Sequence, residues 1–140
     1  MADVDPTYYD SSHPTLPQPP GCILVVWSPL TTTNRKGKAV QLADYPGKCV
    51  IVTGTYSAGS PSVAIEGANG PGTAGNPTAP PIDADFSNCN DPSSTALTFT
   101  AQRIEEVLEN PTWIRPNLTG GDGSTSLTVA LMCTKTARRS

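Results

Sequence analysis

The stretch Lys48-Cys-Val-Ile-Val-Thr-Gly-Thr-Tyr56 gives the strongest prediction of secondary structure in this chain. Its residues are rich in the β-branched types that favour extended strands. Its centre is apolar on both faces, which places the predicted strand in the middle of the domain. Residues 57–60 turn the chain, and apolar residues alternate with others in the next segment, Ser62–Glu66. The two segments are therefore predicted to form a β-hairpin.

The C-terminal part of the chain repeats this pattern. Residues 112–119 and 125–133 are predicted to form a second hairpin around a glycine-rich turn at 120–123. One packed face and one solvated face are typical of an antiparallel sheet. The residues predicted to face inward in the last strand are Leu127, Val129, Leu131 and Cys133. Pro116 in the preceding strand indicates a sheet edge or a bulge.

Shorter strands are predicted over residues 22–27, 38–42 and 97–100. Only residues 101–109 have a helical pattern, because Ile104, Val107 and Leu108 recur at a spacing that makes one apolar stripe. A single helix of this length is marginal in water. We therefore expect it to lie across an open end of the β-structure.

The composition favours an all-β domain with many turns. Charged residues are 15% of the 140-residue chain, below the average of about 25%, and the chain has 12 glycines and 15 prolines. Residues 22–140 are predicted to form one antiparallel β-sandwich, and the residues leave open whether its topology is jelly-roll-like or immunoglobulin-like. A chain of this length is sufficient for one buried core.

Two segments lack a regular pattern. Residues 1–21 form a proline-rich arm, predicted to be extended, with Tyr8 and Tyr9 as aromatic anchors. Either its own sandwich or another subunit must hold such an arm in place, and we favour another subunit. Residues 67–96 form a long irregular loop, a feature that is usually functional or mobile. Phe86 is expected to pin this loop to the body of the protein, and Cys89 is expected to be the least buried cysteine.

No enzyme or cofactor chemistry is predicted. The only histidine, His13, lies in the arm, so no catalytic triad is credible. The pair Asp83 and Asp85 lacks a third acidic ligand nearby. The four cysteines are too widely spaced for a zinc site, and we expect them to be reduced. No metal site is therefore predicted.

Nucleic acid and membrane are not expected as partners. The formal net charge is −3 and the basic residues are mostly scattered, whereas nucleic-acid binding needs clustered positive charge. No run of 18 or more apolar residues is present to span a membrane. The N-terminus is acidic and no apolar run follows it, so we expect no secretory signal.

From Ala43 onward the sequence resembles capsid decoration, or cement, proteins of tailed bacteriophages. The resemblance covers roughly half of the chain, in the same order. It lies in Ala43–Pro46, Val52–Tyr56, Val63–Gly67, Ala96–Ala101, Glu106–Asn110, Trp113–Pro116 and Gly120–Val129. This sequence departs from the family pattern between Gly67 and Pro92, where relatives carry a short turn, and residues 1–21 also differ.

The resemblance implies a jelly-roll-like sandwich without catalysis, present in symmetric copies on the virion. The expected partners are the major capsid protein and the protein itself, with a homodimer favoured and a trimer possible. The expected location is the outer capsid surface, after assembly in the bacterial cytoplasm. A carbohydrate- or receptor-binding module of a phage tail or fibre is the alternative. The candidate contact residues are Tyr8, Tyr9, Pro17, Trp113 and Arg115.

Overall fold

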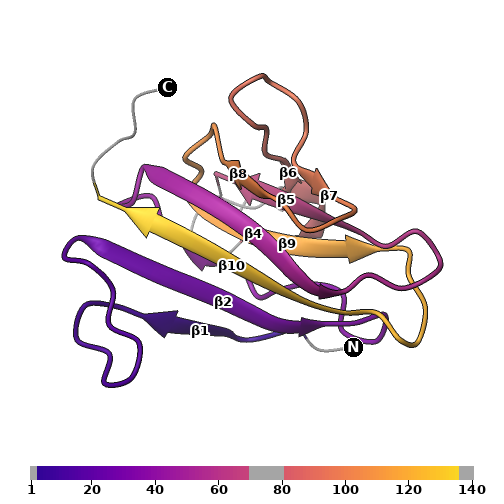
Figure 1. The fold of residues 1–140 in the computed structure, drawn as a ribbon. Helices are drawn as coiled ribbons and strands as arrows, with labels where there is room; N and C mark the ends of the chain where they lie inside the picture. The colour runs from indigo at the N-terminus through magenta and orange to yellow at the C-terminus, as the bar shows by residue number, and fades with distance from the viewer. Residues whose placement is uncertain (1–2, 70–80, 136–140) are drawn as a thin grey trace.

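Strand β4 (Gly47–Thr55) lies inside a sheet, as its residue types predicted. The computed structural model describes residues 3–69 and 81–135, which form two sheets packed face to face (Figure 1). The first sheet has the order β1 (Pro6–Tyr9), β2 (Cys22–Leu30), β10 (Ser126–Thr134), β4 and β8 (Ile104–Glu106). The second has the order β3 (Val40–Gln41), β9 (Trp113–Thr119), β5 (Ser62–Ala68) and β6 (Ser87–Asn88), with β7 (Thr98–Phe99) also paired to β5.

Every pairing between these strands is antiparallel, so the predicted antiparallel β-sandwich is confirmed. The jelly-roll connection pattern stays a prediction. The inward residues of β10 are buried as expected, with Leu127, Val129 and Cys133 fully so. Trp27, on the neighbouring strand β2, lies opposite Val129 and is also in the core.

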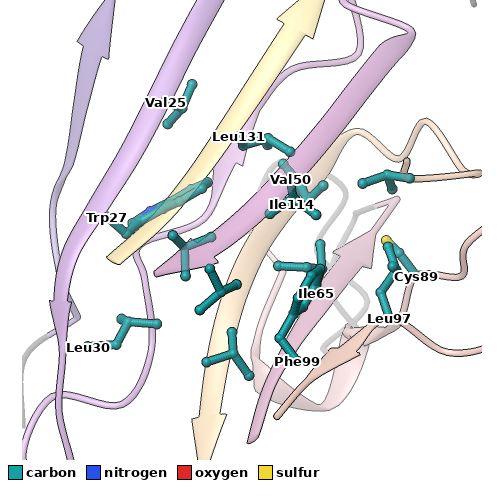
Figure 2. Packing of buried hydrophobic residues seen from close by; sticks show 14 of the residues in the cluster. Val25, Trp27, Leu30, Val50, Ile65, Cys89, Leu97, Phe99, Ile114 and Leu131 are labelled. Atoms are coloured by element: carbon teal, nitrogen blue, oxygen red, sulfur yellow. The ribbon is translucent and has the colours of Figure 1, made fainter. Parts of the chain in front are cut away.

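The core lies between the two sheets (Figure 2). Val25, Val50 and Leu131 come from the first sheet, and Ile65 and Ile114 come from the second. Full burial of such a side chain contributes roughly 1.5–3 kcal/mol to folding. The alternation of apolar residues along each long strand thus supplies both halves of one hydrophobic layer.

Both predicted hairpins are wrong. β4 and β5 belong to different sheets, and so do β9 and β10. Each connection therefore crosses from one sheet to the other, and the two connections meet where the Gly121 N–H donates to the Gly59 carbonyl oxygen at 2.8 Å. An inward-facing alternation fits two strands that face each other across the core as well as two that lie side by side. The pattern alone did not distinguish these arrangements.

The predicted helix at 101–109 is also wrong, because residues 104–106 form strand β8 against β4. Val107 is buried, but Ile104 and Leu108 are largely exposed, so the three residues do not make one buried stripe. The Val107 N–H donates to the Lys48 carbonyl oxygen at 3.0 Å. Pairing along the edge of β4 outweighs the weak tendency of a short isolated segment to form a helix.

The arm is tied to its own sandwich at residues 6–9. These residues form β1, which pairs with β2 from Pro6 opposite Trp27 to Tyr9 opposite Leu24. We expected another subunit to hold the arm in place, but pairing with β2 is enough to order residues 6–9. A loop from Asp10 to Gly21 joins the two strands, and the Gln18 N–H donates to the Asp10 carbonyl oxygen at 2.9 Å.

The long loop packs back onto the second sheet over residues 81–96, whereas Gly67 and Ala68 at its predicted start belong to β5. It contains a 3-10 turn at Asp83–Asp85 and strand β6, which pairs with β5. The expected exposure of Cys89 is wrong, since this residue is only 3% exposed and belongs to the core. Its N–H donates to the Ile65 carbonyl oxygen at 2.8 Å, which carries the side chain inward. Residues 70–80 of the predicted loop lie outside the described residues.

Pro116 lies in an inner strand rather than at a sheet edge, since β9 is flanked by β3 and β5. Strand β3 is only two residues long and pairs with Trp113 and Ile114. Beyond the end of β3 the Pro116 carbonyl oxygen accepts the Gly37 N–H at 3.0 Å. Pro116 therefore lies where the regular pairing between β9 and β3 has already ended.

Candidate functional site

One side of the sandwich is bordered by two edge strands. β1 is the outer strand of the first sheet and β3 is the outer strand of the second. Val4 links the two sheets there, because its N–H donates to the Lys36 carbonyl oxygen and its carbonyl oxygen accepts the Lys38 N–H, each at 2.8 Å. Among the described residues, β1 and β3 each have one neighbouring strand, so each has one backbone edge available for pairing.

A groove of about 480 Å³ runs along this side of the molecule. Tyr8 and Trp113, two of the five candidate contact residues, both line it. The other lining residues are Asp5, Pro6, Lys38, Ala39, Val40 and Gln41. The groove therefore combines two aromatic side chains, one acidic group and one basic group.

The segment that forms one wall of the groove is held against the core. The Trp27 indole Nε1 donates to the Lys38 carbonyl oxygen at 3.0 Å. A Cβ atom on Gly37 would lie 2.5 Å from the Trp27 ring and 2.6 Å from Pro116, so only glycine allows this close approach. The position of Lys38 is thus fixed by a buried tryptophan and a glycine.

Tyr8 and Tyr9 lie on opposite faces of the first sheet because they are neighbours on one strand. The Tyr8 side chain is 48% exposed, and its partial burial raises the pKa of its phenol. The phenol therefore stays neutral near pH 7 and is available as a hydrogen-bond donor. Tyr9 instead contacts the His13 ring, with 4.6 Å between centroids. Pro17 is exposed in the loop after β1 and does not line the groove.

Arg115 is 5% exposed and belongs to a charged cluster on the outer face of the second sheet. Its Nε lies 2.9 Å from a carboxylate oxygen of Glu66, and its Nη1 lies 2.7 Å from a carboxylate oxygen of Asp83. Asp83 also accepts a hydrogen bond from Lys36 Nζ at 2.8 Å. The two hydrogen bonds lower the pKa of Asp83 to about 2. Arg115 thus holds the long loop in place. It does not line the groove, whereas Trp113 on the same strand does.

Sequence reasoning missed the most deeply buried charge. Lys48 is fully buried, and its Nζ donates to the Tyr45 carbonyl oxygen at 2.6 Å and to Asn110 Oδ1. Burial lowers the pKa of Lys48. Its position was a usable signal, because Lys48 has the same inward phase on β4 as Val50 and Val52.

The lining of the groove includes one carboxylate and one amine. Asp5 and Lys38 line it, and neither is paired with a histidine or a nucleophilic cysteine in the lining. Within residues 3–69 and 81–135, no group of three or more histidine, cysteine or acidic side chains is arranged to hold a metal ion. In the same part of the chain, no helix is long and apolar enough to cross a membrane.

The fold and the groove define the class as an antiparallel β-sandwich protein with a candidate binding groove between its sheet edges. Comparison with protein-family models, with curated proteins and with solved structures found no match.

Proposed function

We propose that this chain is a structural virion protein of a tailed bacteriophage that decorates and stabilises the capsid. It binds neighbouring major capsid protein subunits at the outer surface of the virion, after assembly in the host cytoplasm. It has no catalytic role, needs no cofactor and acts as a homo-oligomer. The sequence resemblance supports the capsid as the partner.

The groove between β1 and β3 is the observation that carries the binding role. A partner segment in an extended conformation can add to the free edge of β1 through main-chain hydrogen bonds. Tyr8 and Trp113 then supply aromatic contact area beside that edge. Tyrosine and tryptophan are among the residues that contribute most at protein interfaces. Many weak attachments on one shell add to a strong overall attachment.

Co-sedimentation with purified expanded capsids tests this proposal. Wild-type protein is expected to bind saturably, and a Tyr8→Ala, Trp113→Ala double variant is expected to bind at least about tenfold more weakly. Leu108→Ala is the matched control, since Leu108 is also 48% exposed but does not line the groove. It should bind like wild type.

Failure of wild-type protein to bind capsids contradicts the proposal. The alternative is a carbohydrate-binding module, and one observation favours it: the groove pairs two aromatic side chains with polar groups. A glycan array distinguishes the two functions. Glycan binding that the double variant loses, without capsid binding by the wild type, identifies the sugar-binding function.

A further inference from the structure

The outer face of the first sheet is apolar where an outer face is usually polar. Leu131 pairs with Val25 and Val50, and all three point into the core. Side chains alternate along a strand, so the residues on either side of these three point outward. The register therefore gives the composition of the outer face directly.

Two rows of residues run across all five strands on this face. The first row is Thr7, Val26, Ala130, Ile51 and Ile104. The second row is Tyr9, Leu24, Met132, Cys49 and Glu106. Only Glu106, at the outermost strand, carries a charge. The inner residues of both rows are partly exposed, and Ile104 is 64% exposed.

The outer face of the other sheet has the opposite character. It carries Arg115 and Asn117, which both donate hydrogen bonds to Glu66, and Arg115 also bonds to Asp83 in the turn at residues 83–85. Figure 1 shows β2, β10 and β4 of the first sheet side by side in front of the second sheet. One outer face is thus charged and covered, whereas the other is apolar and has no such cover from the described residues.

We propose that this apolar face, named here the β10 face after its central strand, binds the β10 face of a second copy of this chain. A surface that meets its own copy must avoid opposing like charges. The centre of the β10 face satisfies this condition, because its residues on β2, β10 and β4 are all uncharged. Glu106, the one charged residue in the two rows, lies on the outermost strand β8. An apolar centre with a polar rim is the usual anatomy of a protein interface.

The available area also fits a dimer. β2, β10 and β4 each have nine residues, and five strands lie across the face. The outer strands β1 and β8 have four and three residues, so with strands about 4.8 Å apart and about 3.4 Å per residue the face covers roughly 550 Å². Two copies packed face to face then bury on the order of 1,100 Å², above the roughly 1,000 Å² expected of a specific interface. Sheets commonly pack in this way.

Light scattering combined with size-exclusion chromatography tests the proposal on the full chain without capsids. The wild type is expected to show twice the 14.6 kDa mass of one chain and to dissociate on dilution. Ile51→Glu places a carboxylate at the centre of the β10 face and is expected to raise the dissociation constant about a hundredfold or more. Thr119→Glu, on an exposed end of β9, is the matched control and should remain a dimer.

A second variant and a second measurement guard against loss of folding. Ile51→Thr keeps a β-branched residue on the strand and should still weaken the dimer. Alkylation of Cys49 in the wild type should become faster on dilution, because Cys49 lies in the second row of the β10 face. A constant alkylation rate contradicts the proposal, as does an unchanged mass for folded Ile51→Glu.

The proposal does not depend on the capsid function. A dimer that fails to bind capsids contradicts only the proposed function. A wild-type protein that stays at the mass of one chain at every concentration overturns the dimer. If Ile51→Glu then also abolishes capsid binding, the β10 face belongs to the contact with the shell.

Discussion

The guanidinium carbon of Arg115 lies 3.8 Å from the centroid of the Phe86 ring. Arg115 belongs to β9, in the middle of the second sheet, and Phe86 belongs to the long loop after β5. The same guanidinium is paired with Glu66 and Asp83. One side chain therefore fixes the described end of the loop to the sheet, and the expected pinning of the loop by Phe86 is confirmed.

Replacing Arg115 should strongly destabilise the protein. Arg115→Ala leaves the nearly buried Glu66 carboxylate without its cation, which costs about 3–5 kcal/mol. Urea denaturation measures this cost as a fall in the unfolding free energy. Arg103→Ala is the matched control, because Arg103 also pairs with a carboxylate at 2.9 Å and lies over a phenylalanine ring, but is 40% exposed. The control should lose no more than about 1 kcal/mol, and equal losses contradict this account.

Acid should weaken the attachment of the loop through Asp83. The pKa of Asp83 is lowered to about 2 in the folded protein, from 3.8. A lowered pKa means that its contribution to stability is present above about pH 4 and is lost as the pH falls through 2. Asp83 is largely exposed, so the effect is modest. Melting temperatures of wild type and Asp83→Asn should converge between pH 4 and pH 2, and parallel curves contradict the prediction.

The sequence predicted most long strands but not the pairing between them. Alternation in residues 125–133 identified the inward side chains, because burial depends on the local pattern. Whether two consecutive strands share a sheet depends on distant partners, such as β10 between β2 and β4. The predicted helix failed for the same reason, since the free edge of β4 that β8 occupies is not visible in residues 101–109.

The candidate site was only partly accessible from the sequence. Tyr8 and Trp113 were selected for separate reasons, and only the fold brings them to one groove. Tyr9 was selected with Tyr8, but strand alternation places it on the other face. Arg115 was selected as a contact residue, and the structure places it 5% exposed in a charged cluster. A motif gives residue types, whereas burial depends on segments far away in the chain.

The contact between the two crossing connections should be sensitive to an added methyl group. Gly59 has a φ of +88°, and a Cβ there would lie 2.6 Å from the Gly121 carbonyl oxygen. Gly59→Ala should therefore lower the unfolding free energy by more than about 1 kcal/mol. Gly123→Ala is the control in the facing connection, because a Cβ there meets nothing within 4 Å. Similar stabilities for the two variants contradict the predicted clash.

The four thiols should divide into two classes of reactivity. Cys89 and Cys133 are buried, and burial raises the pKa of each to about 12. The thiolate is the reactive form, so these two should be alkylated only when the protein unfolds. Cys22 and Cys49 are partly exposed and should react first in dilute native protein. Mass spectrometry of alkylated peptides measures the order.

The same thiols should reduce stability at alkaline pH. The pKa values of Cys89 and Cys133 are raised in the folded state. The contribution of these two thiols to folding stability is therefore fully present below the ordinary thiol pKa of 9.0 and is lost as the pH rises toward 12. Melting temperatures should therefore fall above pH 9, and Cys133→Val should reduce the slope of that fall. Cys49→Val is the control for the loss of a thiol as such. If Cys89 in the native protein is alkylated at neutral pH as fast as Cys22, its burial is contradicted. The exposed position expected for Cys89 from the sequence would then be correct.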